Sequence, residues 1–263
     1  MGRCFDGRSW IGHLTMGWRC WWWGARREKT GVRRQESEDG RRKTEDLLEV
    51  VLVLPVPEFY VGVDLGKKVD YTAIAIVECR PGGTPHFLTP WEEPRDFYGL
   101  RHLERIPLGT SYPRVVDRVV RVTRDPALQR RCTLVVDASC VGEPIVDALR
   151  RRDLDCHMIA VTITGGLHET GSGDDRTIPR QSLIHGLEVM LEEEELKIAG
   201  RLPNRGRLVE ELMNLRVERT RGGATKYGAA AARVHDDTVI AVALACWAAR
   251  RGKVGPVGKG RIV

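Results

Sequence analysis

The chain has 263 residues, 42% of them hydrophobic, and a formal net charge of +6, a composition typical of a globular domain rather than of a fibrous or disordered chain. No apolar run is long enough to span a membrane, and seven scattered cysteines without a CxxC pair favour a reducing, cytosolic setting over a disulfide framework. The positive charge comes from the two ends, because residues 58–250 carry 27 basic and 28 acidic side chains, so nucleic-acid binding would require local basic patches.

The first 57 residues differ in composition from the rest of the chain. Five of the seven tryptophans lie between Trp10 and Trp23, and the segment that follows is highly charged and shows no periodicity. Such a segment favours disorder. We therefore predict that residues 1–57 form a poorly ordered extension, either a flexible arm or sequence translated from a start codon placed too early. Residues 58–250 are expected to form the folded domain, and residues 251–263 a basic flexible tail.

The folded region begins with two runs rich in β-branched and aromatic residues, 59–65 and 71–78. A short turn of Gly, Lys and Asp separates them, which predicts an antiparallel hairpin. A third strand is expected at 101–106 or at 86–89. Amphipathic and apolar patterns then predict, in order, a helix, a buried strand, a helix and a second buried strand at 112–126, 132–138, 143–153 and 156–164.

The second half is mostly helical. We predict a helix over 177–195 that opens at Pro179, a short strand at 196–200, a helix over 204–219 whose end is equally compatible with a strand, and an apolar helix over 235–250. The whole order predicts an α/β fold in which helices flank a mixed β-sheet.

Four aspartates lie beside predicted core elements: Asp64 within the first strand, Asp137 at the end of the strand 132–138, and Asp236 and Asp237 at the start of the last helix. Burying a lone carboxylate costs several kcal/mol unless it is paired or bound to a cation. Adjacent parallel strands would place Asp64 beside Asp137, and a helix packed on that sheet could bring Asp236 or Asp237 to the same place.

Such a cluster of hard oxygen ligands suits Mg²⁺ or Mn²⁺. Two such ions about 4 Å apart are the usual device for hydrolysing a phosphodiester. Taken alone, Asp137 is more typical of a turn or a helix N-cap, and two aspartates at a helix start are more typical of a cap. The interpretation as a metal site therefore depends on their occurrence together.

The chain resembles the C-terminal nuclease domain of the large terminase subunit of tailed bacteriophages in four segments, taken in order: VGVDLGKKVDYTAIAIVE, LVVDASCVGEPIVDALRR, RTIPRQSLIHGLEVMLEEEELKIAGRLPNRGRLVEELMNLRVE and VHDDTVIAVALACWAA. The resemblance covers residues 58–250 and implies an RNase H-like fold. The family pattern has an Asp in the first strand, an acidic residue at the end of the fourth strand, and HDD at the start of a late helix.

This resemblance implies a metal-dependent endonuclease that cuts double-stranded viral DNA during genome packaging in the host cytoplasm, with two Mg²⁺ or Mn²⁺ ions. Asp64 and Asp137 would be metal ligands. Asp236 or Asp237 would supply the third carboxylate; helix spacing leaves the choice open, with a slight preference for Asp236. His235 could orient a carboxylate or a water molecule. The implied partners are a separate ATPase subunit, the small terminase subunit and the portal protein.

Contacts with the DNA backbone are expected from basic residues near these motifs, each of which could also be an ordinary solvated charge. Two lie just after Asp64, one matches a position that is often basic in the family, and the others lie in the segment RVERTRGGATKYG, a candidate flexible hairpin. These residues are Lys67, Lys68, Arg180, Arg216, Arg219, Arg221 and Lys226.

One departure from the family is large. A complete large terminase begins with an ATPase motor, but the chain contains no GxxxxGK[ST] phosphate-loop pattern. We therefore expect a nuclease domain without a motor, arising from a split gene, a fragment or a prophage remnant. The alternatives are a non-catalytic docking remnant, a nuclease similar to Holliday-junction resolvases, and an actin-like or sugar-kinase-like ATPase, whose first phosphate hairpin VGVDLG would also fit.

Overall fold

The computed structural model describes residues 56–66, 70–82, 96–128, 130–139, 143–219, 225–229 and 235–252. Nearly all of the predicted N-terminal extension and basic tail lie outside these ranges, as does the alternative third strand at 86–89, so these remain predictions. Within the described ranges, no helix combines the length and the hydropathy needed to cross a membrane.

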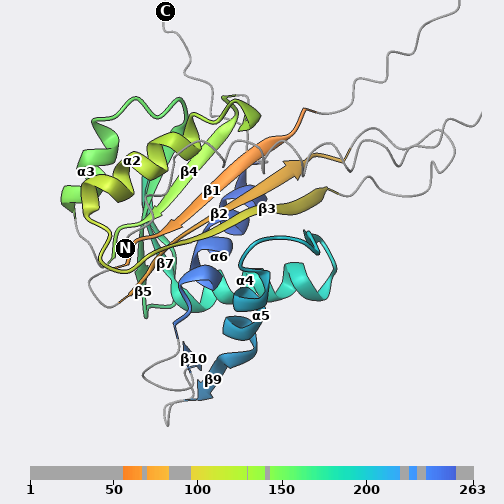
Figure 1. The fold of residues 1–263 in the computed structure, drawn as a ribbon. Coiled ribbons are helices and arrows are strands. Elements are labelled where there is room, and N and C mark those ends of the chain that lie inside the picture. The colour runs from red at the N-terminus through yellow and green to blue at the C-terminus, as the bar shows by residue number, and fades with distance from the viewer. Residues whose placement is uncertain are drawn as a thin grey trace, which may run out of the picture. The chain divides into compact units, whose positions relative to one another are not determined.

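The described strands form one large sheet and a separate hairpin (Figure 1). The large sheet has eight strands in the order β6-β7-β5-β4-β1-β2-β3-β8, and β9 pairs with β10. The strands are β1 (Glu58–Asp64), β2 (Thr72–Arg80), β3 (Phe97–Ile106), β4 (Cys132–Asp137), β5 (His157–Thr164), β6 (Thr170–Ser172), β7 (Asp175–Pro179), β8 (Leu196–Ile198), β9 (Leu215–Arg219) and β10 (Thr225–Ala229).

Helices cover both faces of the sheet. Figure 1 shows α2 and α3 on one face, and α6 with α4 and α5 on the other. The helices are α2 (Tyr112–Thr123), α3 (Glu143–Arg150), α4 (Arg180–Glu192), α5 (Arg205–Asn214) and α6 (Asp237–Arg251), and a single 3₁₀ turn spans Pro126–Leu128. The predicted α/β fold with a mixed sheet and flanking helices is therefore confirmed.

The centre of the sheet follows the predicted hairpin and parallel pair. β1 and β2 are antiparallel, and β3 continues this pairing on β2. β4 pairs parallel with the other edge of β1, and β5 pairs parallel with β4. The resulting order β3-β2-β1-β4-β5, with β2 antiparallel to the others, is that of the RNase H-like sheet which the sequence resemblance implies.

Helix α6 lies directly on β1 and is almost completely buried. Its apolar residues are mostly small, and Gly62 of β1 lies so close beneath it that an added Cβ would be 2.0 Å from the Ala241 carbonyl oxygen and 2.8 Å from the Ala245 nitrogen. Ala241 and Ala245 are themselves fully buried. The absence of a side chain at Gly62 thus sets how closely the helix approaches the sheet.

Two sequence expectations about local structure were wrong. The helix that was expected to open at Pro179 begins one residue later, at Arg180, and strand β7 precedes it directly. Pro179 occupies the N-cap in an extended conformation with φ −61° and ψ 130°, because its ring fits equally well just before a helix. The short edge strand β6 was not predicted; its three residues are all exposed and carry no apolar pattern.

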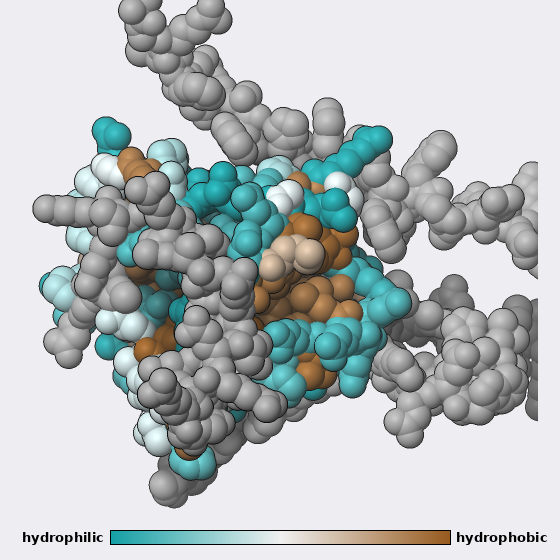
Figure 2. Space-filling model, turned by 90° about the horizontal axis from the view of Figure 1, so that it is seen from below, coloured by the Kyte–Doolittle hydropathy of each residue, from teal (hydrophilic) through white to brown (hydrophobic). Residues whose placement is uncertain are grey.

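The segment from α5 onwards agrees better with the sequence. The helix that was expected to run into a strand ends at Asn214, and β9 follows at Leu215. Strand β9 pairs antiparallel with β10, which confirms the expected hairpin. The face seen from below in Figure 2 carries apolar residues bordered by hydrophilic ones. Helix α5 exposes Val209 and Met213 and buries Leu208 and Glu211.

Candidate metal centre

The candidate site is built on one row of residues that crosses the sheet, which we call the acidic row. Asp64 pairs with Ala73 of β2, and Ala73 pairs with Arg105 of β3. On the other side, Val63 pairs with Val136, so Asp64 and Asp137 follow as neighbours at the ends of two parallel strands, about 5 Å apart at their Cα atoms. The predicted proximity of these two carboxylates is therefore supported by the strand register.

This row faces the start of helix α6. Side chains alternate along a strand, and Gly62, two residues before Asp64, faces α6 directly. Val135, two residues before Asp137, belongs to the same buried cluster as the apolar residues of α6. Asp64 and Asp137 therefore lie on the α6 face of the sheet, and α6 starts at that end with Asp236 at its N-cap and Asp237 as its first residue.

Asp64 has the strongest electrostatic perturbation in the site. Burial, followed by the charges of Asp137, Asp237 and Asp236 in that order, raises the pKa of Asp64 well above its usual value, and Arg180 opposes this. No hydrogen bond or ion pair to the Asp64 carboxylate is found among the described residues. The charges of three other carboxylates thus act on Asp64 at the end of the sheet, opposed by the single positive charge of Arg180.

Asp137 is held by the turn that follows β4. Ser139 donates two hydrogen bonds to Asp137 Oδ1, from its amide at 2.8 Å and from its hydroxyl at 2.5 Å. The same hydroxyl accepts a hydrogen bond from the Ile163 amide of β5. Burial raises the pKa of Asp137 even though the hydrogen bonds from Ser139 lower it. Asp137 is therefore a turn residue, as its position at the end of a strand permits. Only its Oδ1 atom accepts the hydrogen bonds of that turn, and its Oδ2 atom does not take part.

Asp237 is held by a buried arginine. Arg105 Nη2 donates to Asp237 Oδ2 at 3.0 Å, and both side chains are less than a tenth exposed. The Arg105 guanidinium also stacks on the ring of Tyr71, 3.4 Å from its centroid. Burial raises the pKa of Asp237, against the lowering effect of Arg105. The carboxylate is thus fixed through one oxygen, in the position from which it acts on Asp64.

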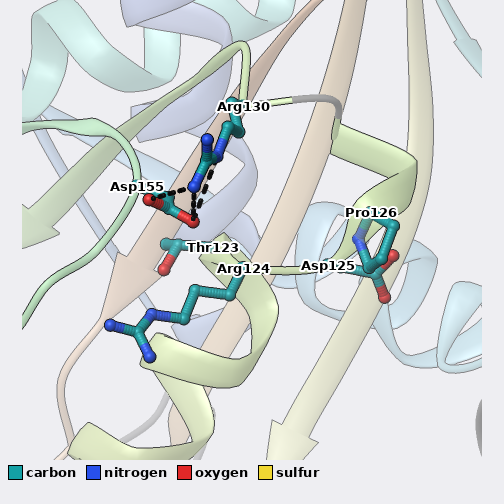
Figure 3. A pocket seen from close by; sticks show the side chains of 6 residues that line it. All are labelled: Thr123, Arg124, Asp125, Pro126, Arg130 and Asp155. Carbon is teal, nitrogen blue, oxygen red and sulfur yellow. Dashed lines mark hydrogen bonds and ion pairs between the residues drawn. The ribbon is translucent and has the colours of Figure 1, made fainter.

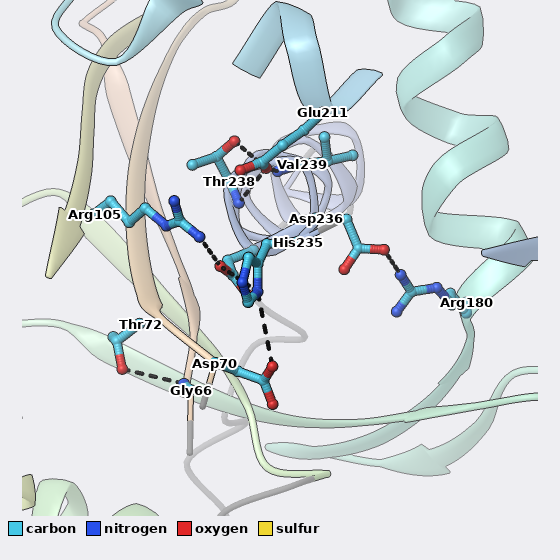
Figure 4. Close-up of polar contacts among 11 residues, drawn as sticks. Gly66, Asp70, Thr72, Arg105, Arg180, Glu211, His235, Asp236, Thr238 and Val239 are labelled. Carbon is cyan, nitrogen blue, oxygen red and sulfur yellow. Dashed lines mark hydrogen bonds and ion pairs between the residues drawn. The ribbon is translucent and has the colours of Figure 1, made fainter. Parts of the chain in front are cut away.

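Figure 4 shows His235 between Arg105 and Asp236, and Asp236 turned toward Arg180. Arg180, the first residue of α4, forms an ion pair with Asp236, and both are partly exposed. His235 Nδ1 lies 3.8 Å from Asp70 Oδ1 and 3.9 Å from Asp237 Oδ2, and its ring meets the edge of Tyr71. These contacts are compatible with the predicted auxiliary position of His235.

The carboxylate oxygens are the type of ligand that a hard divalent cation prefers, although these side chains do not meet at one point in the structure. Among the described residues, no three His, Cys, Asp or Glu side chains are close enough to ligate one ion. Arg180 holds Asp236, Arg105 holds Asp237 and Ser139 holds Asp137. Oxygen-only ligands and a surplus of negative charge are nevertheless what Mg²⁺ and Mn²⁺ require.

The predicted DNA contacts are only partly described. Arg180 points to Asp236 (Figure 4) and is therefore part of the acidic site. Lys67, Lys68 and Arg221 lie outside the described residues. The side chains of three further residues are not described, although their backbones lie in the β9–β10 hairpin: Arg216, Arg219 and Lys226.

Sequence reasoning missed two charged residues that organise the site, Arg105 and Glu211. Arg105 follows the buried Leu103 by two positions in β3, so it occupies an inward position of the strand. Glu211 lies three positions after the buried Leu208 of α5, on the apolar side of that helix. A charge at an inward position of a strand or helix was the available signal in both cases.

A surface pocket occurs at the other end of the sheet, beside the starts of β4 and β5 (Figure 3). Arg124 and Arg130 line it, but both are paired with carboxylates. Arg130 contacts Asp155, and Arg124 lies 2.9 Å from Asp153. The pocket therefore has no concentration of unpaired charge and lies away from the acidic row.

Comparison with known proteins gives matches at the level of structure. These structural neighbours are nuclease domains of phage large terminases. The magnesium-bound nuclease of thermophilic phage G20c is 22% identical, with a TM-score of 0.49 over 73% of this chain and 82% of that one. The nuclease domain of Thermus phage P74-26 is 21% identical, with a TM-score of 0.48 over 72% of this chain and 78% of that one.

The manganese-bound g2p nuclease domain of bacteriophage SPP1 is 14% identical, with a TM-score of 0.41 over 72% of this chain and 84% of that one. No protein-family profile and no curated protein matches the chain. These identities are too low to transfer residue roles or metal use from those proteins to this chain.

Proposed function

We propose that the chain is a metal-dependent endonuclease that cuts double-stranded DNA during phage genome packaging. The observation that carries the proposal is the acidic row at the end of the sheet. It places Asp64 beside Asp137 and opposite the start of α6, where all three other carboxylates raise the pKa of Asp64. Repulsion between these carboxylates and the burial of the unpaired Asp64 carboxylate oppose folding, and a bound cation would offset both.

In this proposal Asp64 and Asp137 bind the cation, and Asp237 supplies the third carboxylate. Helix spacing slightly favoured Asp236, but Asp237 is the more deeply buried of the two and affects the pKa of Asp64 more strongly. Arg105 approaches only the Oδ2 atom of Asp237. Its other oxygen is thus available while Arg105 fixes the orientation. Asp236 is a further ligand once Arg180 moves away, and Arg180 is then free to contact a DNA phosphate.

Mg²⁺ or Mn²⁺ ions, when bound, would activate a water molecule and stabilise negative charge on the phosphate under attack. The chain would act on double-stranded DNA in the host cytoplasm. Its partners would be a separate ATPase subunit, the small terminase subunit and the portal protein. Arginines and lysines near the site would contact the phosphate backbone without reading bases.

The test is cleavage of supercoiled plasmid by the purified full chain with Mn²⁺ and with EDTA, for the wild type and Asp64→Asn. We expect cleavage by the wild type only, and only with Mn²⁺. Asp174→Asn is the matched control, because Asp174 is an exposed aspartate paired with His157, outside the acidic row. Its cleavage should equal that of the wild type.

A stability measurement separates loss of function from loss of fold. The raised pKa of Asp64 means that its ionised form costs folding free energy at neutral pH. Asp64→Asn should therefore melt at a higher temperature than the wild type in EDTA, and Mn²⁺ should raise the melting temperature of the wild type alone. Undiminished cleavage by Asp64→Asn would refute the assignment, and ATP turnover would favour the kinase-like alternative.

A further inference from the structure

Helix α6 begins without a cap from its own sequence. Asp236 occupies the N-cap, and aspartate is among the residues that most often accept hydrogen bonds from the first free amides of a helix. Its side chain makes no such bond and forms an ion pair with Arg180 instead. The amides at the start of α6 therefore need another acceptor, because the helix is buried there.

Glu211 of α5 provides that acceptor (Figure 4). Its Oε2 atom accepts hydrogen bonds from the Thr238 amide at 2.9 Å and the Val239 amide at 3.3 Å. The Thr238 hydroxyl donates to the same oxygen. Glu211 is 4% exposed and Thr238 is completely buried. The cap of α6 thus comes from a different helix, 27 residues earlier in the chain.

This arrangement is costly for stability alone. Glu211 Oε1 is buried and has no hydrogen-bond partner among the described residues, and the same holds for Arg105 Nε. A buried carboxylate with only one oxygen satisfied is less favourable than an N-cap made by the residue at that position. Because Glu211 supplies the cap, the Asp236 side chain does not have to, and it pairs with Arg180 instead.

We propose that Glu211 is a positioning residue. It caps α6 in place of the Asp236 side chain, so that Asp236 and Asp237 can face the ends of β1 and β4. This inference rests on the proposed function, because the released carboxylates matter only if they bind a cation. Glu211 itself does not contact the cation or the DNA in this proposal. It acts by fixing the first turn of α6, on which both aspartates are carried.

The experiment uses the full chain with three variants: Glu211→Ala, Glu211→Gln and Leu208→Ala. Exchange of the Thr238 and Val239 amides is followed by NMR without metal, and Mn²⁺ binding is titrated by calorimetry. In Glu211→Ala we expect exchange of these amides to become about fivefold faster and Mn²⁺ affinity to fall about tenfold. Glu211→Gln should keep both close to wild type, because its amide oxygen can accept the same hydrogen bonds.

Leu208→Ala is the matched control, since Leu208 is buried on the same helix but makes no bond to α6 amides. It should lower stability without changing Mn²⁺ affinity. Unchanged exchange of the two amides in Glu211→Ala would overturn the capping role, and an equal loss of Mn²⁺ affinity in Leu208→Ala would overturn the positioning role. A wild-type chain that binds no Mn²⁺ would instead refute the proposed function, while the exchange data would still decide whether Glu211 is the cap.

Discussion

The contact between Gly62 and α6 allows a sharp test of how the site is assembled. An alanine Cβ at position 62 would lie 2.0 Å from the Ala241 carbonyl oxygen, whereas ordinary contact begins at 3.4 Å. The helix backbone would have to move away by about 1.4 Å, because a second backbone atom, the Ala245 nitrogen, lies only 2.8 Å away. Neither atom belongs to a flexible side chain that could rotate out of the way.

We therefore expect Gly62→Ala to lower the free energy of unfolding by about 1–3 kcal/mol, the usual cost of overpacking a core. The same shift moves Asp236 and Asp237 relative to Asp64. A displacement of about 1 Å can reduce a catalytic rate about 100-fold, so Mn²⁺-dependent cleavage should fall by more than the loss of stability explains. Urea unfolding followed by circular dichroism, and plasmid cleavage at a temperature where the variant is folded, measure the two effects.

Gly186→Ala provides the control for this substitution. Gly186 lies within α4, and an added Cβ would have no neighbouring atom within 4 Å. The change should raise the free energy of unfolding by up to about 1 kcal/mol through helix propensity, and leave cleavage unchanged. If Gly62→Ala unfolds and cleaves as the wild type does, the close contact between β1 and α6 does not position the site.

Two further predictions concern ion pairs. Arg105→Ala should lower the free energy of unfolding in EDTA by about 3–5 kcal/mol, because it leaves the buried Asp237 carboxylate unpaired. Mn²⁺ should restore part of this loss. A decrease of less than about 1 kcal/mol in EDTA would show that the pair is not buried in solution. At Glu104, burial raises the pKa, but hydrogen bonds from His102 and Arg118 prevail and hold it at about 2. A lowered carboxyl pKa contributes stability above about pH 4.5 that is lost as the pH falls toward 2. Arg118→Gln should therefore be less stable than the wild type by about 1–2 kcal/mol at pH 7, and the denaturation midpoints of the two proteins should converge at low pH. A difference that stays constant with pH would contradict this pairing.

The parts of the fold that could be predicted are those whose signal is local. The β1–β2 hairpin and the strand β4 are continuous runs of apolar or β-branched residues, and their lengths leave few alternatives. The strand β6 and the extended end of β7 at Pro179 carry no such run. They form because β5 offers an edge for pairing, which no pattern within the segment itself can indicate.

The candidate site shows the same division. Asp64 and Asp137 could be identified because a charge at the end of an apolar strand is conspicuous in the sequence. The partners of the acidic pair could not, because Arg105 lies 132 residues from Asp237 and Arg180 lies 56 residues from Asp236. Arg180 was expected to contact DNA, and its ion pair with Asp236 became visible only once α4 and α6 were placed side by side.

The position of α6 in the chain has a consequence for synthesis. This helix rests on the central strand β1, yet the ribosome makes it after every strand of the large sheet. About 170 residues separate Asp64 from Asp237, which corresponds to roughly 9–35 s of translation at 5–20 residues per second. During that interval β1 lacks the helix that packs on it, although α4 and α5 of the same face have already been made. In a nascent chain, Asp236 and Asp237 would therefore reach the ends of β1 and β4 only after synthesis had passed Arg251.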